Sequence, residues 1–309
     1  MNTKLSGVLA PVLTPFDSNL RPDHARFVQV CRWLIEKRCG LAMFGTNSEG
    51  NSLAPDERID LLAAVVDAGL PPYRMLPGTG SCSLTDAVRL TQMATKAGCA
   101  GVLMLPPFYY KNVTDEGLFS FYSEVIERVA EPTLRIYLYH IPPVAAVGIS
   151  HDLVERLLKR YPKVIAGIKD TGGDWNYTVN MIDRFSSDGF DVFAGTETIL
   201  LDTMRAGGAG CISATANVNP VSIVRLFDTW QAPDALQQQE TLNALRLCFS
   251  QFPLIAAMKS AISWATGDRN WLTMRSPLQS LDDVQRPLLE LKLRDINFSM
   301  DGLEPLQVA

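Results

Sequence analysis

The chain has few of the residues from which metal sites and disulfides are built. Its 309 residues include three histidines, and none of them lies at a metal-site spacing from another His, Cys or acidic residue. The six cysteines are scattered and form no C-x-x-C pair, which predicts reduced thiols in a cytoplasmic protein. These shortages argue against zinc or iron chemistry.

The chain also lacks basic runs and long apolar stretches. Its formal net charge is -5, and a nucleic-acid-binding face needs a basic patch, so we expect no nucleic-acid partner. Pro11 and Pro15 interrupt the apolar start, which has neither the charged leader of a signal peptide nor the length of a membrane span. The composition, 47% apolar and 20% charged, is typical of a soluble globular protein.

What the chain does have is a regular alternation of short apolar runs and amphipathic stretches. The runs that we interpret as strands are residues 7–13, 41–44, 73–76, 102–105, 134–139, 164–168, 192–194 and 210–213. A stretch with helical spacing follows each of them. Eight strand–helix units predict an α/β fold in which a parallel sheet closes into a (β/α)8 TIM barrel.

The last part of the chain reads differently. Residues 232–309 contain no convincing strand, whereas residues 236–252, 254–266 and 282–293 have helical patterns. We therefore expect a barrel catalytic domain over residues 1–231. A helical extension over residues 232–309 would pack on it.

Lys169 is the strongest candidate for a functional residue. It closes the apolar run 164–168 and is followed at once by Asp170 and a Gly-rich turn, which indicates a buried strand that ends at a lysine. Burial disfavours the charged form of a lysine and leaves a neutral amine that can attack a ketone. The same pattern also fits a lysine that reaches out to solvent or pairs with Asp170.

Hydroxyl-bearing and small residues are expected beside this lysine, because functional side chains of such barrels lie where strands end. Residues 45–50, 108–110, 139–142 and 195–197 each follow a predicted strand. A lysine amine that attacks a ketone, a hydroxyl that relays protons, and N–H groups that hold a carboxylate together suit imine chemistry on a 2-oxo acid.

At these positions the chain resembles the dihydrodipicolinate synthase / N-acetylneuraminate lyase family of class I Schiff-base aldolases. The motifs that carry the resemblance, in order, lie at residues 9–16, 45–49, 139–142, 167–170 and 208–213. Each motif is weak alone, but five in order on a predicted barrel are specific. The resemblance implies a pyruvate-dependent lyase without metal or organic cofactor, assembled as a homotetramer from tight dimers.

The resemblance also implies roles for single residues. Lys169 would form the imine, Tyr139 would shuttle protons, and Tyr109 would cross a dimer interface into the neighbouring site. The implied substrate-binding residues are Thr46, Asn47, Gly195 and Ile212. Plainer interpretations stay open: Tyr139 fits an ordinary strand end, and the loop residues fit a turn. The Tyr109 region also fits aromatic packing alone.

Three departures from the family pattern bear on the reaction. Val144 stands where the synthases carry an arginine that holds the second substrate's carboxylate, Asn47 replaces a threonine of their hydroxyl relay, and His140 replaces an asparagine. They favour aldol cleavage, condensation or dehydration of a 2-oxo-3-deoxy sugar acid or a 4-hydroxy-2-oxo acid over dihydrodipicolinate synthesis. The sequence does not choose between cleavage and dehydration. A hypothesis of another class is a non-catalytic barrel that binds a small acid.

Overall fold

The computed structural model describes residues 5–306, so the outer ends of both predicted domains, residues 1–4 and 307–309, lie outside it. The strands are β1 (Gly7–Ala10), β2 (Gly40–Leu41), β3 (Val102–Met104), β4 (Ile136–His140), β5 (Ile165–Asp170), β6 (Asp191–Ala194) and β7 (Gly210–Ile212). The barrel helices are α1 (His24–Glu36), α2 (Pro55–Asp67), α3 (Leu84–Lys96), α4 (Asp115–Val129), α5 (Pro142–Ala145), α6 (His151–Arg160), α7 (Trp175–Phe185), α8 (Leu200–Arg205) and α9 (Pro220–Asp228).

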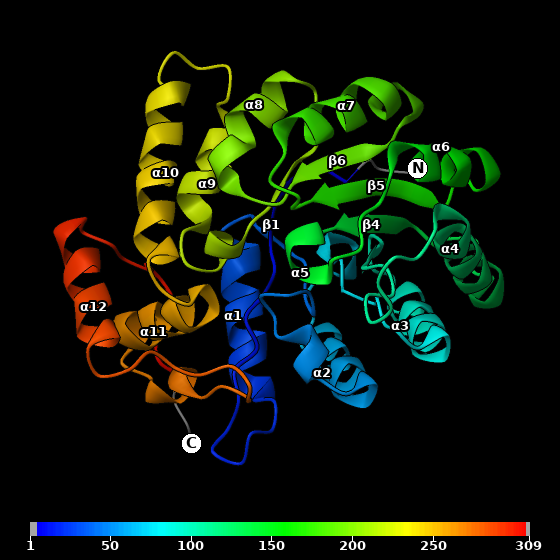
Figure 1. Ribbon diagram of the computed structural model, residues 1–309. Helices are drawn as coiled ribbons and strands as arrows, with labels where there is room; N and C mark the ends of the chain where they lie inside the picture. Colours follow the sequence, from blue (N-terminus) through cyan, green and yellow to red (C-terminus); the bar gives the residue numbers. More distant parts are fainter. Residues whose placement is uncertain (1–4, 307–309) are drawn as a thin grey trace.

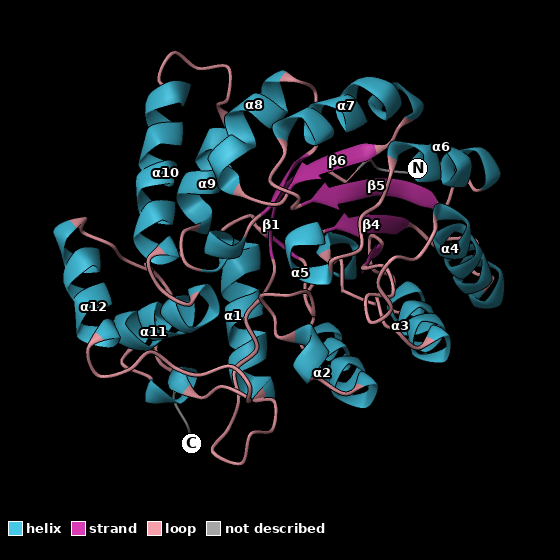
Figure 2. Ribbon diagram, viewed as in Figure 1, coloured by secondary structure: helices cyan, strands magenta, loops and turns pink. Residues whose placement is uncertain are grey.

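All strand pairs are parallel, in the order β2-β1-β7-β6-β5-β4-β3, and helices surround the sheet (Figures 1 and 2). The gap between β2 and β3 is closed by the segment 75–79. Leu76 N–H donates to Leu41 O at 2.7 Å, and Thr79 N–H donates to Leu103 O at 3.0 Å. The structure therefore confirms the predicted barrel.

The predicted third strand, residues 73–76, is the one that differs most from expectation. Pro72–Arg74 forms a short 3-10 helix, and only single bridges, Leu41 to Met75 and Gly78 to Leu103, connect this side of the barrel. Pro77 lies between the two bridges and has no N–H to donate, so a continuous ladder cannot form here.

The sheet separates two hydrophobic cores, one inside the barrel and one between the sheet and the helices. Ile168 packs in the outer core, between sheet and helices, while Tyr137, Tyr139 and Ala166 belong to the inner one. The register of β4 against β5 shifts by one residue at Ala166, a β-bulge. This shift matters because it sets which side chains at the end of β5 face the interior.

The C-terminal part consists of α10 (Ala235–Ser250), α11 (Leu254–Thr266) and α12 (Gln285–Asp295), which lie together on one side of the barrel (Figure 1). Gln239 of α10 donates to Glu197 O and accepts from Leu201 N–H, both at 2.9 Å, so this helix contacts the loop after β6. The domain boundary at residue 231 stays a prediction. No helix among the described residues is long and apolar enough to cross a membrane.

Gly167 is expected to be irreplaceable in the inner core. A Cβ there would lie 2.2 Å from Asp191 O and 2.7 Å from the Tyr137 ring. We expect Gly167→Ala to lower the free energy of unfolding by about 3 kcal/mol, because backbone atoms cannot move aside. As a control, Gly117→Ala on α4 has room and should be neutral or stabilising by up to about 1 kcal/mol. Urea unfolding of both variants tests this, and equal midpoints would contradict it.

Candidate active site

Lys169 and Tyr139 lie side by side at the carboxyl ends of neighbouring strands. The register pairs Tyr139 of β4 with Lys169 of β5, and Lys169 in turn with Phe193 of β6. The Lys169 Nζ donates to the Tyr139 hydroxyl at 3.3 Å and lies 4.3 Å from the centre of its ring. Lys169 is 2% exposed, so the amine lies inside the barrel and does not reach out to solvent.

Thr46 extends this pair into a chain of three groups. Its Oγ1 lies 3.2 Å from the Tyr139 hydroxyl, so lysine, tyrosine and threonine are linked by hydrogen bonds. Asn47 follows in the same loop and is half-buried. Tyr139 is therefore placed between the amine and the loop, where it can accept a proton from one side and pass it to the other.

Asp170, the alternative partner of Lys169, binds elsewhere. Its carboxylate accepts the Gly172 N–H at 2.8 Å and the Thr178 hydroxyl at 2.5 Å, both in the turn and helix that follow β5. Burial raises the pKa of this carboxyl, against the lowering effect of the two hydrogen bonds. Asp170 thus anchors the start of α7, and Lys169 forms no ion pair within residues 5–306.

The other two expected pocket residues take different positions. Gly195 N–H donates to Asp170 O at 2.6 Å, and a Cβ at this glycine would lie 2.1 Å from Thr171 Oγ1. It therefore lies beside the end of β5, where only a hydrogen fits. Ile212 is fully buried in the inner core, in the same cluster as Tyr139.

Sequence reasoning missed several neighbours of these groups. The Thr171 hydroxyl is buried between β5 and Gly195 and has no hydrogen-bond partner among the described residues. A small cavity of about 20 Å³, room for about one water molecule, touches both Thr46 and Tyr139. Its further lining residues are Phe44, Gly45, Asn51, Gly78, Gly80, Leu103 and Leu105. Gly45, Leu103 and Leu105 lie in segments that the sequence analysis had singled out, whereas Gly78 and Gly80, which follow Pro77, are the sequence signal that could have indicated the rest of this wall.

Tyr109 lies apart from this cluster within the single chain. It is 72% exposed, and its ring packs edge-on against Tyr110, itself exposed. Two adjacent tyrosines that face solvent form an apolar surface at a loop after β3. Both tyrosines therefore lie outside the inner core and away from Lys169 of the same chain.

His140 is a packed, neutral residue. Its Nδ1 accepts the Ile149 N–H at 3.0 Å, and its ring stacks on Tyr177 with 4.1 Å between the ring centres. Burial, with a smaller effect of His151, lowers the pKa of His140 to about 4. A neutral imidazole whose Nδ1 already accepts a backbone hydrogen bond fits a structural role for this residue.

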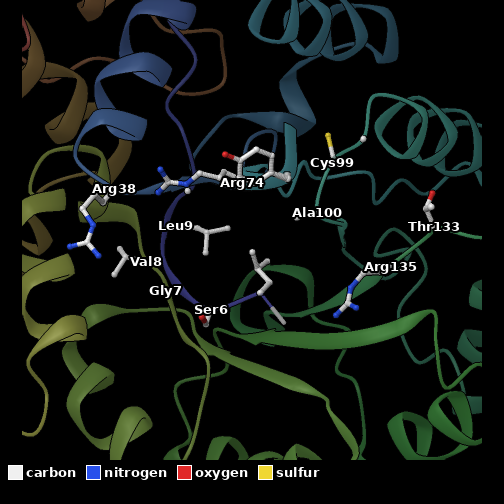
Figure 3. Close-up of a pocket in the computed structure, with 14 residues that line it drawn as sticks. Ser6, Gly7, Val8, Leu9, Arg38, Arg74, Cys99, Ala100, Thr133 and Arg135 are labelled. Atoms are coloured by element: carbon white, nitrogen blue, oxygen red, sulfur yellow. The ribbon is translucent and has the colours of Figure 1, made fainter. Parts of the chain in front are cut away.

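A second hollow lies at the opposite end of the barrel. This cavity of about 350 Å³ is lined by the beginnings of β1 and β2 and by Arg38, Arg74 and Arg135 (Figure 3). Each guanidinium has a partner: Asp228, the Ile35 carbonyl, and the Tyr137 hydroxyl with Asp191 nearby, respectively. Arg135 thus lies at the end of the barrel away from Lys169.

The described part of the chain brings no three His, Cys, Asp or Glu side chains together as a metal site requires. The groups available around Lys169 are hydroxyls, N–H groups and the amine itself.

His140 should make stability depend on pH in a defined window. The pKa of His140 in the folded protein, about 4, lies below the unfolded value near 6.5. The neutral imidazole therefore contributes fully to the free energy of unfolding above pH 6.5, and this contribution is lost as the pH falls toward 4. The loss approaches about 1.4 kcal/mol per pH unit. Urea unfolding of the wild type and His140→Asn at pH 7, 6 and 5 should show a flatter dependence in the variant. Parallel curves would contradict this.

Comparisons with known proteins show which family the chain belongs to. The model of the Dihydrodipicolinate synthetase family matches residues 4–296. An uncharacterized DapA-like lyase of Chloroflexus aurantiacus is 29% identical over 90% of this chain and 93% of its own. A 4-hydroxy-tetrahydrodipicolinate synthase of Nitratidesulfovibrio vulgaris is 30% identical over 95% and 97%.

Solved structures give the same result. The dihydrodipicolinate synthase of Agrobacterium tumefaciens superposes with a TM-score of 0.85 at 30% identity and covers 94% of this chain and 98% of its own. YagE, a prophage protein of E. coli K12 solved in complex with pyruvate, has a TM-score of 0.85 at 26% identity, over 95% and 99%. The chain therefore belongs to the dihydrodipicolinate synthase family of lyases and aldolases.

Proposed function

We propose that this lyase works through an imine between the Lys169 amine and the ketone carbon of pyruvate or another 2-oxo acid. The observation that carries the proposal is the buried chain Lys169–Tyr139–Thr46, with steps of 3.3 and 3.2 Å. A buried amine beside a hydroxyl relay serves imine formation directly. The amine adds to the ketone carbon, and the ketone oxygen leaves as water after it takes up protons through Tyr139.

The imine then provides the electron sink for the reaction. In cleavage, the bond between C3 and C4 breaks, its electron pair moves toward the imine nitrogen, and the C4 hydroxyl loses its proton as the aldehyde departs. In dehydration, C3 loses a proton instead, and the electron pair of that C–H bond moves toward the imine nitrogen. The resulting enamine then expels the C4 hydroxyl, which takes up a proton and leaves as water. The hydroxyl and N–H groups of Thr46 and Asn47 would hold the substrate carboxylate throughout. No separate cofactor is needed in either route.

We favour a 2-oxo-3-deoxy sugar acid or a 4-hydroxy-2-oxo acid as substrate. The synthase alternative requires an anchor for a second carboxylate, and the loop after β4 offers Val144, 64% exposed, at the expected place. Lys111 lies near this loop, but its ammonium donates to the carbonyls of Phe108 and Ala145. Relatives named as synthases at 30% identity keep the synthase as the alternative.

A non-catalytic barrel that binds a small acid is the alternative of another class. Such a binder would need the Thr46 and Asn47 loop but neither a buried amine nor a proton relay. The finding of both groups in contact therefore supports the enzyme. The cytoplasm, with its small organic acids, is the compartment that we propose for it.

The imine is tested by borohydride reduction in the presence of pyruvate, followed by intact-mass and peptide mass spectrometry. We expect a reduced pyruvyl adduct on Lys169. Lys169→Ala should lose the adduct and turnover while it still binds the acid. The matched control is Lys163→Ala, at an exposed lysine in the turn before β5. This variant should still form the adduct on Lys169. No adduct on folded wild-type protein, with either pyruvate or longer 2-oxo acids, would contradict the proposal.

We further propose that the chain forms a homotetramer of tight dimers in which Tyr109 completes the neighbouring site. The exposed Tyr109–Tyr110 surface supports this, since large aromatic side chains in solvent mark contact surfaces. The small acid substrate would then be bound by residues of two subunits.

Mixed subunits test this assignment. If Tyr109 acts across an interface, Tyr109→Ala and Lys169→Ala are each inactive, yet reassociated mixtures regain about a quarter of the wild-type activity, because half of the dimers are mixed and have one intact site. Tyr110→Ala serves as the control and should keep its own activity. Mixtures that remain inactive, or fully active monomers in sedimentation experiments, would overturn the assignment.

A further inference from the structure

The loop of residues 45–50 is closed on itself and has little freedom. Glu49 N–H donates to Thr46 O at 3.1 Å, and Gly50 N–H donates to Gly45 O at 3.0 Å. Glu49 adopts a left-handed backbone conformation, with φ 55°, which is unusual for a residue with a side chain. A Cβ at Gly50 would lie 2.1 Å from Phe44 O. A contact of the Glu49 side chain is needed to stabilise this conformation.

Helix α11 of the C-terminal part provides this contact. The Lys259 Nζ forms an ion pair with the Glu49 carboxylate, and both side chains are at most 1% exposed. The same ammonium donates to Thr273 O at 3.2 Å and lies 4.6 Å from the centre of the Phe16 ring. Burial raises the pKa of Glu49 and lowers that of Lys259, while their mutual attraction opposes both changes.

The position of this pair relates it to substrate binding. Glu49 lies three residues from Thr46 in the loop proposed to hold the substrate carboxylate. Without Lys259 beside it, more of the Glu49 charge would act on that carboxylate, and the left-handed conformation would lose one of the contacts that hold it. Lys259 neutralises the charge and fixes the conformation at the same time.

We infer that Lys259 is a positioning residue for the substrate carboxylate, and that it acts through Glu49. The inference rests on the proposed function, because it concerns the same loop and the same acid. It gives the C-terminal extension a direct part in the proposed site, because Lys259 of α11 sets the shape of the loop that would hold the substrate carboxylate.

The test uses two ketones that differ in the carboxylate. Pyruvate and acetone both can form an imine with Lys169, but only pyruvate needs the loop. The variant is the double substitution Glu49→Gln with Lys259→Met, which removes the pair without leaving a buried unpaired charge. The control is Asp268→Asn, which breaks the 2.6 Å ion pair to Arg26 that joins α1 to the turn after α11.

In the double variant, we expect the pyruvate concentration for half-maximal borohydride trapping to rise about 10- to 100-fold, because small displacements of binding groups have effects of this size. Trapping with acetone, and trapping at saturating pyruvate, should match the wild type. Asp268→Asn should behave as wild type with both ketones. If the double variant does not fold, Glu49→Asp keeps both charges but shortens the reach to Lys259, and the pyruvate dependence should change in the same direction.

An unchanged pyruvate dependence would overturn the inference, and so would an equal loss with pyruvate and acetone, which would indicate a general disturbance of Lys169. Failure of the proposed function gives a different result. In that case wild-type protein itself forms no adduct with pyruvate, whatever the variants do.

Discussion

The hydrogen-bonded pairing of β4 with β5 is the constraint on which the site depends. It places Tyr139 opposite Lys169, and the bulge at Ala166 sets the register in which both side chains face the interior. Because the side chains of a strand alternate between two faces, a shift of one residue would turn the amine into the helix layer. Gly167 permits this arrangement, since the strand approaches Tyr137 too closely for a side chain.

The sequence predicted this part of the site because the relevant information is local. Lys169 and Tyr139 each end an apolar run, and consecutive parallel strands end at the same edge of a barrel. Prediction was weaker where hydrogen bonding decides the outcome: the expected strand 73–76 is reduced to bridges by Pro77. It failed for contacts between distant segments, because no pattern within the sequence links Glu49 to Lys259 or indicates that the Thr171 hydroxyl is buried beside Gly195.

The helices after the barrel contact, at two places, the end of the barrel that carries Lys169. Gln239 of α10 holds the loop that follows β6, and Lys259 of α11 holds the loop that follows β2. Arg275 adds a third connection, since its guanidinium pairs with Glu57 and donates to Ser52 O at 2.7 Å. The extension therefore contacts loops at the end of the barrel that carries Lys169, as well as covering the barrel surface.

The ion pair between Glu49 and Lys259 also has a consequence for synthesis of the chain. A ribosome makes residue 49 early and residue 259 late, so about 210 residues are added before the loop meets its partner. Lys169 is made in between. A chain that ends before residue 259 thus has Lys169 but lacks the partner of Glu49. If the loop of residues 45–50 binds the substrate carboxylate as we propose, such a chain would carry the amine without the ion pair that shapes this loop.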